Sequence, residues 1–239
     1  MKIMKKRSFK VLLCIIAVIL GIGITFGIYT SNYYHAVGGY QNTEVDIAEY
    51  EHFTIYGNSI TETGIIFYPG GKVEAKAYEP LLCELAEKGI CCVLVDMPFH
   101  LAVFDKDAAI PVMEQISTVN NWYLAGHSLG GAMAASCVSD HIDEFAGLIL
   151  LAAYPTEELP TDFPVLSIYG SEDGVLNREK YAASIGLATN LTEVIIEGGN
   201  HAGFGNYGFQ EGDNPAAISN EEQWEATVEG MLTFINELD

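Results

Sequence analysis

Residues 122–131 combine a nucleophile with a turn that could present it. The stretch reads Trp-Tyr-Leu-Ala-Gly-His-Ser-Leu-Gly-Gly and places Ser128 between Gly126 and Gly130, a G-x-S-x-G pattern. An apolar run precedes the serine and small residues, 132–137, follow it, which indicates strand, sharp turn and helix. Glycines suit such a turn because side chains there would collide with the neighbouring strand and helix. The turn would lift the serine hydroxyl clear of the sheet and aim the first N–H groups of the helix at an oxygen above it.

A serine hydroxyl becomes a useful nucleophile when a base takes its proton and an acid orients that base. After Ser128 the sequence contains two histidines, His141 and His201. His141 directly follows the expected serine helix, where a surface position is favoured. His201 lies in a glycine-rich loop, 197–203, after an expected strand at 193–196, and from there it could reach back over the sheet. We therefore predict His201 as the base.

The acid is expected at the end of the strand before the histidine loop. Residues 165–169 predict this strand, and Gly-Ser-Glu-Asp-Gly-Val follows it, which favours Asp173. Glu172 is the adjacent competitor, and Asp162 and Asp96 are weaker ones. An Asp-Gly pair is also common in solvated turns. The position after a buried strand, ahead of the histidine loop, favours a role in the site.

The order serine, acid, histidine, together with the strand–serine–helix motif, resembles the α/β-hydrolase superfamily over roughly residues 60–239. Three stretches, 68–82, 97–104 and 198–208, look like a compact, lidless, dienelactone-hydrolase-like subgroup. Dienelactone hydrolases proper use cysteine as the nucleophile, whereas this chain has serine. The resemblance implies an α/β-hydrolase fold with a mostly parallel, doubly wound sheet. It also implies a serine hydrolase that cleaves an ester or related acyl bond through an acyl-enzyme, without a metal or cofactor.

The same resemblance implies two N–H donors for the oxyanion that forms during acyl transfer. The N–H of Leu129, at the start of the serine helix, is expected to supply one of them. The superfamily takes the other from the loop after its third strand, which here is Tyr-Pro-Gly-Gly-Lys at 68–72. Gly71 is the prediction and Lys72 the alternative. Pro69 stands where a histidine is common, and a simple turn would also explain the Pro-Gly-Gly sequence.

Strands and helices alternate along the rest of the chain. Apolar runs typical of buried strands occur at 64–68, 90–95 and 165–169, and further strands are expected at 122–125, 146–151 and 193–196. Helices are expected at about 79–89, 108–116, 132–137 and 220–238, the last with Ser219 and Glu222 as a capping box. Residues 45–60 predict early β-structure. This alternation favours a parallel sheet covered on both faces.

The N-terminal region has the pattern of a membrane anchor. Residues 11–29 carry no charge, and five of the eleven basic residues lie in the first ten positions. A run of this length can cross a bilayer as a helix, with the basic cluster in the cytoplasm. We predict a signal anchor at 1–30, a linker and early β-structure at 31–59, and an extracytoplasmic catalytic domain at 60–239. Secretion after signal cleavage is the alternative, although only a late small-residue site, Ala-Val-Gly at 36–38, follows.

The charge of the chain limits its possible partners, and its cysteines can be assessed from their neighbours. Beyond residue 10, six Lys/Arg oppose all 32 Asp/Glu, a net charge of −26, which argues against nucleic acid as a partner. The expected partners are a small-molecule acyl substrate and, through the N-terminal helix, the membrane; the oligomeric state stays open. Apolar neighbours favour buried free thiols over a disulfide at Cys83, Cys91, Cys92 and Cys137.

Two alternatives to ester hydrolysis remain open on the sequence. A binding domain without catalytic activity could use the same fold, because fold alone does not give function. The same three residues could also transfer the acyl group to an alcohol instead of water. Apolar acyl-pocket walls and core packing explain the aromatic residues after the strands equally well; these residues are Phe99, Phe104, Phe204 and Tyr207.

Overall fold

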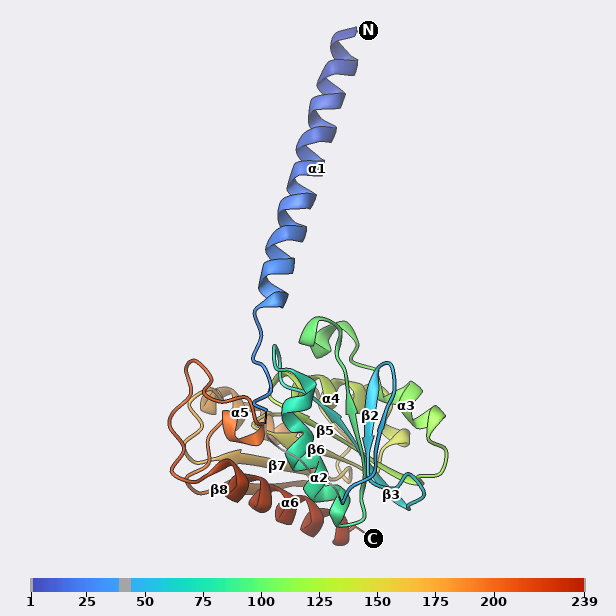
Figure 1. Ribbon diagram of the computed structural model, residues 1–239, viewed down its shortest axis with the longest axis vertical. Helices are drawn as coiled ribbons and strands as arrows, with labels where there is room; N and C mark the ends of the chain where they lie inside the picture. Colours follow the sequence, from blue (N-terminus) through green and yellow to red (C-terminus); the bar gives the residue numbers. More distant parts are fainter. Residues whose placement is uncertain (1, 39–43, 239) are drawn as a thin grey trace. The chain divides into compact units, whose positions relative to one another are not determined.

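The structure is a computed structural model that describes residues 2–38 and 44–238 (Figure 1). Contacts divide the chain into two compact units, residues 1–33 and residues 34–239. The first unit is dominated by helix α1 (Lys2–Ser31). Its segment Phe9–Ser31 has a mean hydropathy of 2.9, so it is long and apolar enough to cross a membrane or to act as a signal sequence.

The second unit is built on an eight-stranded sheet with the order β1-β2-β4-β3-β5-β6-β7-β8. The pairs β1–β2 and β2–β4 are antiparallel and all other neighbours are parallel. The mostly parallel sheet that the sequence predicts is therefore confirmed. The strands are β1 (Ile47–Glu49), β2 (Phe53–Tyr56), β3 (Thr63–Tyr68), β4 (Cys91–Val95), β5 (Asn121–His127), β6 (Gly147–Leu151), β7 (Val165–Gly170) and β8 (Leu191–Ile196).

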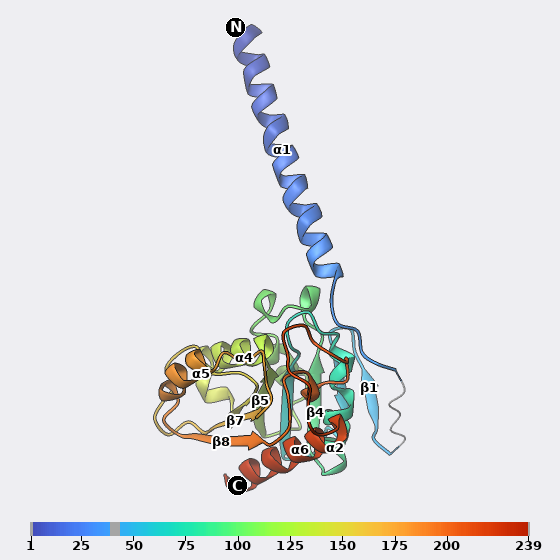
Figure 2. The ribbon, with the colours of Figure 1, turned by 90° about the vertical axis from the view of Figure 1, so that its left-hand side faces the viewer.

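Helices cover both faces of this sheet. The α-helices are α2 (Glu79–Glu87), α3 (Ala109–Gln115), α4 (Leu129–Asp140), α5 (Arg178–Ser184) and α6 (Asn220–Asn236). Short 3-10 helices occur at η1 (Ala75–Tyr78), η2 (Pro98–His100), η3 (Ala102–Phe104), η4 (Ile142–Glu144), η5 (Ile185–Leu187) and η6 (Ala202–Phe204). Figures 1 and 2 show α4 and α6 on opposite sides of the strands β7 and β8.

The alternation of side chains along β3 explains the two layers. Ile65 and Phe67 pack into one core with α2 and α6, whereas Ile66 and Tyr68 pack into the other core with α3 and α4. Successive side chains of a strand point to opposite faces, so a strand buried on both sides must be apolar throughout. All six residues of β3 are buried. This double burial explains why the strand reads as a continuous apolar run in the sequence.

The last helix follows its prediction closely, whereas one helix has no counterpart among the predictions. In α6 the Ser219 side chain accepts from the N–H of Glu222, and the Glu222 side chain accepts from the N–H of Ser219, which forms the predicted capping box. Helix α5 was not predicted. It buries only Tyr181, and the residue before it, Asn177, is its N-cap, whose side chain accepts from the N–H of Lys180. One buried residue leaves no periodic apolar stripe to detect.

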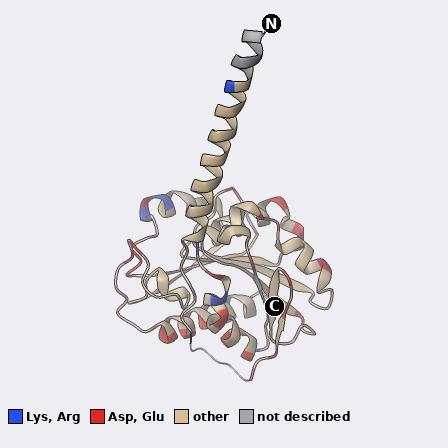
Figure 3. Ribbon diagram, turned by 45° about the horizontal axis from the view of Figure 1, so that its top comes forward, with Lys and Arg blue, Asp and Glu red and all other residues tan. Residues whose placement is uncertain are grey.

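Charge and thiols in the second unit agree with the sequence. Figure 3 shows acidic residues spread over the helices and loops of the domain, with few basic residues among them. Cys83, Cys91, Cys92 and Cys137 are buried free thiols in the described structure. Burial raises the pKa of the Cys137 thiol to about 12, so this group stays protonated at neutral pH.

Candidate active site

The turn between β5 and α4 holds Ser128 in a strained conformation. Ser128 has φ 52° and ψ −121°, a region that L-residues seldom occupy. Two glycines make the turn possible. A Cβ at Gly126 would lie 2.6 Å from the Gly131 nitrogen, and one at Gly130 would lie 2.3 Å from the carbonyl oxygens of Tyr68 and Pro69. The G-x-S-x-G spacing therefore follows from contacts between backbones.

Substitution of Gly130 by alanine is expected to destabilise the fold strongly. The new Cβ would collide with two backbone oxygens, which cannot rotate away, so we expect a loss of about 3 kcal/mol or more in the free energy of unfolding. Gly186→Ala is the matched control because a Cβ there meets nothing within 4 Å; it should change stability by less than about 1 kcal/mol. Urea unfolding of the detergent-solubilised chain measures both. Equal midpoints for the two variants would contradict the packing argument.

His201 and Asp173 meet directly at the carboxyl ends of β8 and β7. The distance from His201 Nδ1 to Asp173 Oδ2 is 2.9 Å, and both side chains are almost fully buried, at 2% and 0% exposure. The other carboxylate oxygen, Oδ1, accepts the N–H groups of Val175 and Leu176 at 2.9 and 2.7 Å. Two backbone donors thus fix the carboxylate and leave Oδ2 for the histidine.

The charge state of Asp173 follows from these contacts. Burial alone would raise the pKa of this carboxyl, but the hydrogen bonds from His201, Leu176 and Val175 outweigh it, so the pKa is lowered. Asp173 is therefore an anion at neutral pH. Because its pKa is lower in the folded state, it adds stability above its unfolded pKa of about 3.9 and loses that contribution as the pH falls below this value.

Ser128 and His201 line the same cavity, of about 300 Å³. His201 Nε2 is buried and has no hydrogen-bond partner within the described residues. A buried ring nitrogen without a partner is unusual in a folded protein and indicates a place for a substrate or hydroxyl group. The remaining lining residues are Leu129, Ala132, Ala152, Ala153, Tyr154, Thr156, Val175, Leu176 and Asn177.

The loop after β3 lies against the first residue of α4. A Cβ at Gly71 would be 2.7 Å from Leu129 Cδ2, so these two residues are in contact. The N–H of Lys72 donates to the His100 carbonyl oxygen at 2.7 Å, and the N–H of Gly70 donates to Tyr78 Oη at 3.0 Å. The N–H of Gly71 forms no hydrogen bond with any residue that the structure describes. Of the two predicted alternatives, Gly71 has the available donor.

His127 is a buried part of the site that the sequence analysis did not single out. Tyr78 Oη accepts from the N–H of Gly70 and lies 2.8 Å from His127 Nδ1, to which its own proton can be donated. The His127 ring packs on that of His201, with centroids 4.6 Å apart. Burial, and then the neighbouring His201, lower the pKa of His127 well below its ordinary value, so this ring stays neutral. A lone histidine inside the motif gave no signal for this contact.

Stability should fall as the pH drops below about 6.5 because of His127. The unfolded chain binds a proton there and the folded chain does not, so each pH unit below that value costs up to about 1.4 kcal/mol. His127→Asn removes the titration and keeps an acceptor for Tyr78. We expect its free energy of unfolding to depend less on pH than that of the wild type between about pH 5 and 6.5. Parallel pH curves in urea unfolding would refute this origin of the acid sensitivity.

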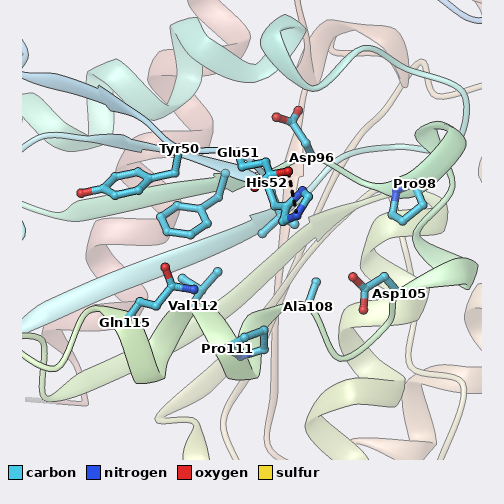
Figure 4. A pocket seen from close by; sticks show the side chains of 12 residues that line it. Tyr50, Glu51, His52, Asp96, Pro98, Asp105, Ala108, Pro111, Val112 and Gln115 are labelled. Carbon is cyan, nitrogen blue, oxygen red and sulfur yellow. Dashed lines mark ion pairs between the residues drawn. The ribbon is translucent and has the colours of Figure 1, made fainter.

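The rival acids and the second histidine lie elsewhere. Glu172 and Asp162 are exposed, and neither lines the Ser128 cavity. Asp96 lines a separate cavity of about 420 Å³ beside α3, together with His52 and Asp105 (Figure 4). His141 pairs with Asp107, at 3.5 Å between Nε2 and Oδ1. The structure thus brings Ser128, His201 and Asp173 together, and it separates the alternatives from them.

The aromatic residues considered as acyl-pocket walls do not line the cavity at Ser128. Phe204 and Tyr207 are buried in the core with α2 and α6. Phe99 and Phe104 are about half exposed and pack edge-to-face on each other, with ring centroids 5.6 Å apart. Small residues form much of the cavity wall instead: Ala132 in α4, and Ala152 and Ala153 after β6. Their positions gave no such signal in the sequence.

Comparison with known proteins agrees with this fold. The sequence profile of the alpha/beta hydrolase family matches residues 64–225, and the chain belongs to this family. A provisionally named non-heme haloperoxidase of Mycobacterium phage D29 is 29% identical over 117 residues, which cover 43% of this chain and 41% of that protein. The chain thus matches less than half the length of this curated relative.

Solved structures share the fold at low sequence identity. Est1E from Butyrivibrio proteoclasticus is 18% identical, with a TM-score of 0.54 over 80% of this chain and 99% of that chain. Thermogutta terrifontis esterase 2, phosphoramylated by tabun, is 17% identical, with a TM-score of 0.58 over 83% and 96%. The alpha/beta hydrolase MGS-MChE2 from a sediment metagenome of the Mar Chica lagoon is 15% identical, with a TM-score of 0.61 over 80% and 98%.

Proposed function

We propose that this protein is a serine hydrolase of esters or related acyl compounds, with Ser128 as nucleophile, His201 as base and Asp173 as the acid that orients it. One observation carries the proposal. His201 Nδ1 lies 2.9 Å from the buried carboxylate of Asp173, and its Nε2, which has no partner among the described residues, belongs to a residue that lines the same cavity as the strained Ser128. Membership of the alpha/beta hydrolase family and the esterases among the structural neighbours support it.

The mechanism follows from the protonation of His201. Because Nδ1–H donates to Asp173, the lone pair on Nε2 can accept the Ser128 proton as Oγ attacks the acyl carbon. His201 then returns this proton to the leaving oxygen as the bond to the leaving alcohol breaks, and Ser128 carries the acyl group. Water gives a proton to Nε2 and attacks the acyl-enzyme. His201 then gives this proton to Ser128 Oγ as the bond to the acyl group breaks, which releases the acid and restores the serine hydroxyl and the neutral ring.

The N–H groups of Leu129 and Gly71 are the proposed donors to the oxyanion. Leu129 is the first residue of α4, where backbone N–H groups have no partner within the helix. Gly71 lies against Leu129 and has an N–H without a partner among the described residues. Preorganised donors of this kind stabilise the charge that develops on the carbonyl oxygen.

Substitution of Gly71 by proline should lower kcat by about a hundredfold to a thousandfold, because it removes one N–H from the oxyanion site. Gly71→Ala is the matched variant, since it keeps the N–H; its Cβ would meet Leu129 Cδ2 at 2.7 Å and Leu129 Cβ at 3.2 Å, so the Leu129 side chain has to shift by a small amount. We expect Gly71→Ala to keep most of the activity. Steady-state hydrolysis of a chromogenic ester measures both. If the two variants lose activity equally, the N–H of Gly71 is not an oxyanion donor.

The cavity at Ser128 supports a small acyl substrate. Its volume is about 300 Å³, the lower limit for pockets that bind drug-sized ligands. Ala132, Ala152 and Ala153 leave room beside the serine, and Leu176 adds an apolar wall. Esters of short acyl chains therefore fit better than long-chain esters. A chain-length series of p-nitrophenyl esters, compared by kcat/KM, tests this preference.

The proposed topology is a single-pass anchor with the domain, residues 34–239, outside the cytoplasm. The support is the apolar helix Phe9–Ser31 and the basic residues before it. Secretion after signal cleavage is the alternative. Protease accessibility of the domain in intact cells, with the mass of the mature chain, distinguishes a retained anchor from a cleaved signal.

A fluorophosphonate probe tests the proposed function directly. The full chain in detergent should form one adduct, mapped by mass spectrometry to Ser128, because only an activated serine attacks phosphorus at a useful rate. His201→Ala should abolish the adduct, and denatured wild type should not react. Absence of an adduct in folded protein would overturn the proposal.

A further inference from the structure

Residues 34–37, here called the N-terminal clasp, are hydrogen-bonded into the second unit. Tyr34 N donates to Lys72 O at 2.7 Å, and Glu74 N donates to Tyr34 O at 2.9 Å, so Tyr34 forms a parallel bridge with the loop after β3. The N–H of Ala36 donates to Glu74 Oε2 at 2.9 Å. The sequence predicts linker and early β-structure over the range 31–59. Within that range, the clasp forms hydrogen bonds with the loop after β3, residues 69–74, which is here called the oxyanion loop because it contains Gly71.

The other end of the clasp contacts the loop after the catalytic histidine. Val37 N donates to Asn206 O at 2.7 Å, and Asn206 Nδ2 donates to Val37 O at 3.1 Å. The N–H of Glu211 donates to Tyr34 Oη at 3.2 Å, and the Tyr34 ring lies 5.6 Å from that of Tyr207. The clasp thus joins the loop that bears Gly71 to the loop that follows His201.

We propose that the N-terminal clasp is a positioning segment of the active site: it holds the oxyanion loop and the histidine loop in register. This inference rests on the proposed function. Only Lys72 separates Gly71 from Val73, the bridge partner of Tyr34, so movement of the bridge moves the proposed donor. Displacement of a catalytic group by about 1 Å can cost about a hundredfold in rate.

Buried side chains between the two loops also connect the clasp to the proposed active site. Tyr207 packs between Tyr34 and Tyr78, with ring centroids at 5.6 and 6.5 Å. Tyr78 in turn bonds Gly70 and His127, and His127 packs on His201. Contacts between side chains therefore connect the clasp to His201, through Tyr207, Tyr78 and His127. The hydrogen bond between Tyr78 and Gly70 also connects the clasp to the loop that bears Gly71.

The clasp also links catalysis to the integrity of the N-terminal segment. The late small-residue site at 36–38 lies at its C-terminal end. A cut there would separate Tyr34 from the domain to which it bonds. Release of the domain from the helix by such a cut would thus lower activity along with membrane attachment.

Two substitution pairs in the full chain test the inference. Val37→Pro removes the N–H that bonds Asn206, whereas Val37→Ala keeps it and shortens a side chain that is half exposed. Tyr34→Ala removes the ring beside Tyr207, whereas Tyr34→Phe keeps the ring and loses only the hydroxyl. Activity is expressed per active site by titration with the fluorophosphonate, so unfolded protein does not enter the rate.

Val37→Pro and Tyr34→Ala should lower kcat about tenfold to a hundredfold, with KM within about threefold of wild type. Their fluorophosphonate labelling rates should fall in parallel, and Val37→Ala and Tyr34→Phe should stay close to wild type. The inference would be overturned if folded Val37→Pro and Tyr34→Ala kept the wild-type kcat per titrated site, even if their melting temperatures were lower. If Val37→Pro does not fold, the Tyr34 pair decides. An unlabelled wild type would instead refute the proposed function.

Discussion

Substitution of Ser128 by alanine is expected to lower kcat by about a million-fold while the fold remains intact. The proposed nucleophile is lost, and the remaining oxyanion donors and the cavity can only assist direct attack by water. Stability should stay within about 1 kcal/mol of wild type, because alanine at φ 52° has the same backbone strain as serine. Hydrolysis of a p-nitrophenyl ester and urea unfolding of the same preparation measure the two effects.

Ser136→Ala provides the control for this substitution. Ser136 lies on the same helix, α4, and its hydroxyl contacts the exposed Glu157 at 3.2 Å, outside the cavity lining. Its activity should equal that of the wild type. If Ser128→Ala turned over substrate at nearly the wild-type rate, Ser128 would not be the nucleophile, whichever residues line the cavity.

The parts of the site that follow from local backbone geometry could be predicted from the sequence. The turn at Ser128 needs glycines two residues before and after the serine, because the backbones of the turn, α4 and the β3 loop touch there. Asp173 follows the buried strand β7 and His201 follows the edge strand β8, and the carboxyl ends of parallel strands lie at one edge of a sheet. The fold class was predictable for a related reason, since strands buried on both faces are apolar throughout.

Features that depend on backbone hydrogen bonds or on single side chains could not be predicted from the sequence. The N-terminal clasp bonds largely through main-chain atoms, which any residue but proline carries, so residues 34–37 show no distinctive pattern. His127 is one polar residue in an apolar strand, and its neighbours Tyr78 and His201 come from distant parts of the chain. Cavity walls depend in the same way on which strand ends meet. Local sequence carries little information about such long-range contacts.

Substitution of Asp173 by asparagine should lower kcat about ten-thousand-fold, and the geometry explains why the effect is so large. Val175 and Leu176 both donate to Oδ1, so the asparagine carbonyl oxygen must occupy that position. Its NH₂ group then faces His201 Nδ1, which can only accept. The ring proton must move to Nε2, and the base loses the lone pair that would take the Ser128 proton.

Glu172→Gln separates this tautomer effect from a general loss of negative charge. Glu172 is adjacent but exposed, so its variant should retain wild-type activity. The pH profile gives a second readout, because a change of pH cannot restore the tautomer that the asparagine excludes. Near-wild-type activity of Asp173→Asn at any pH would therefore contradict this role of Asp173. A flat, low profile would show that its main role is to hold the ring of His201 with Nε2 unprotonated.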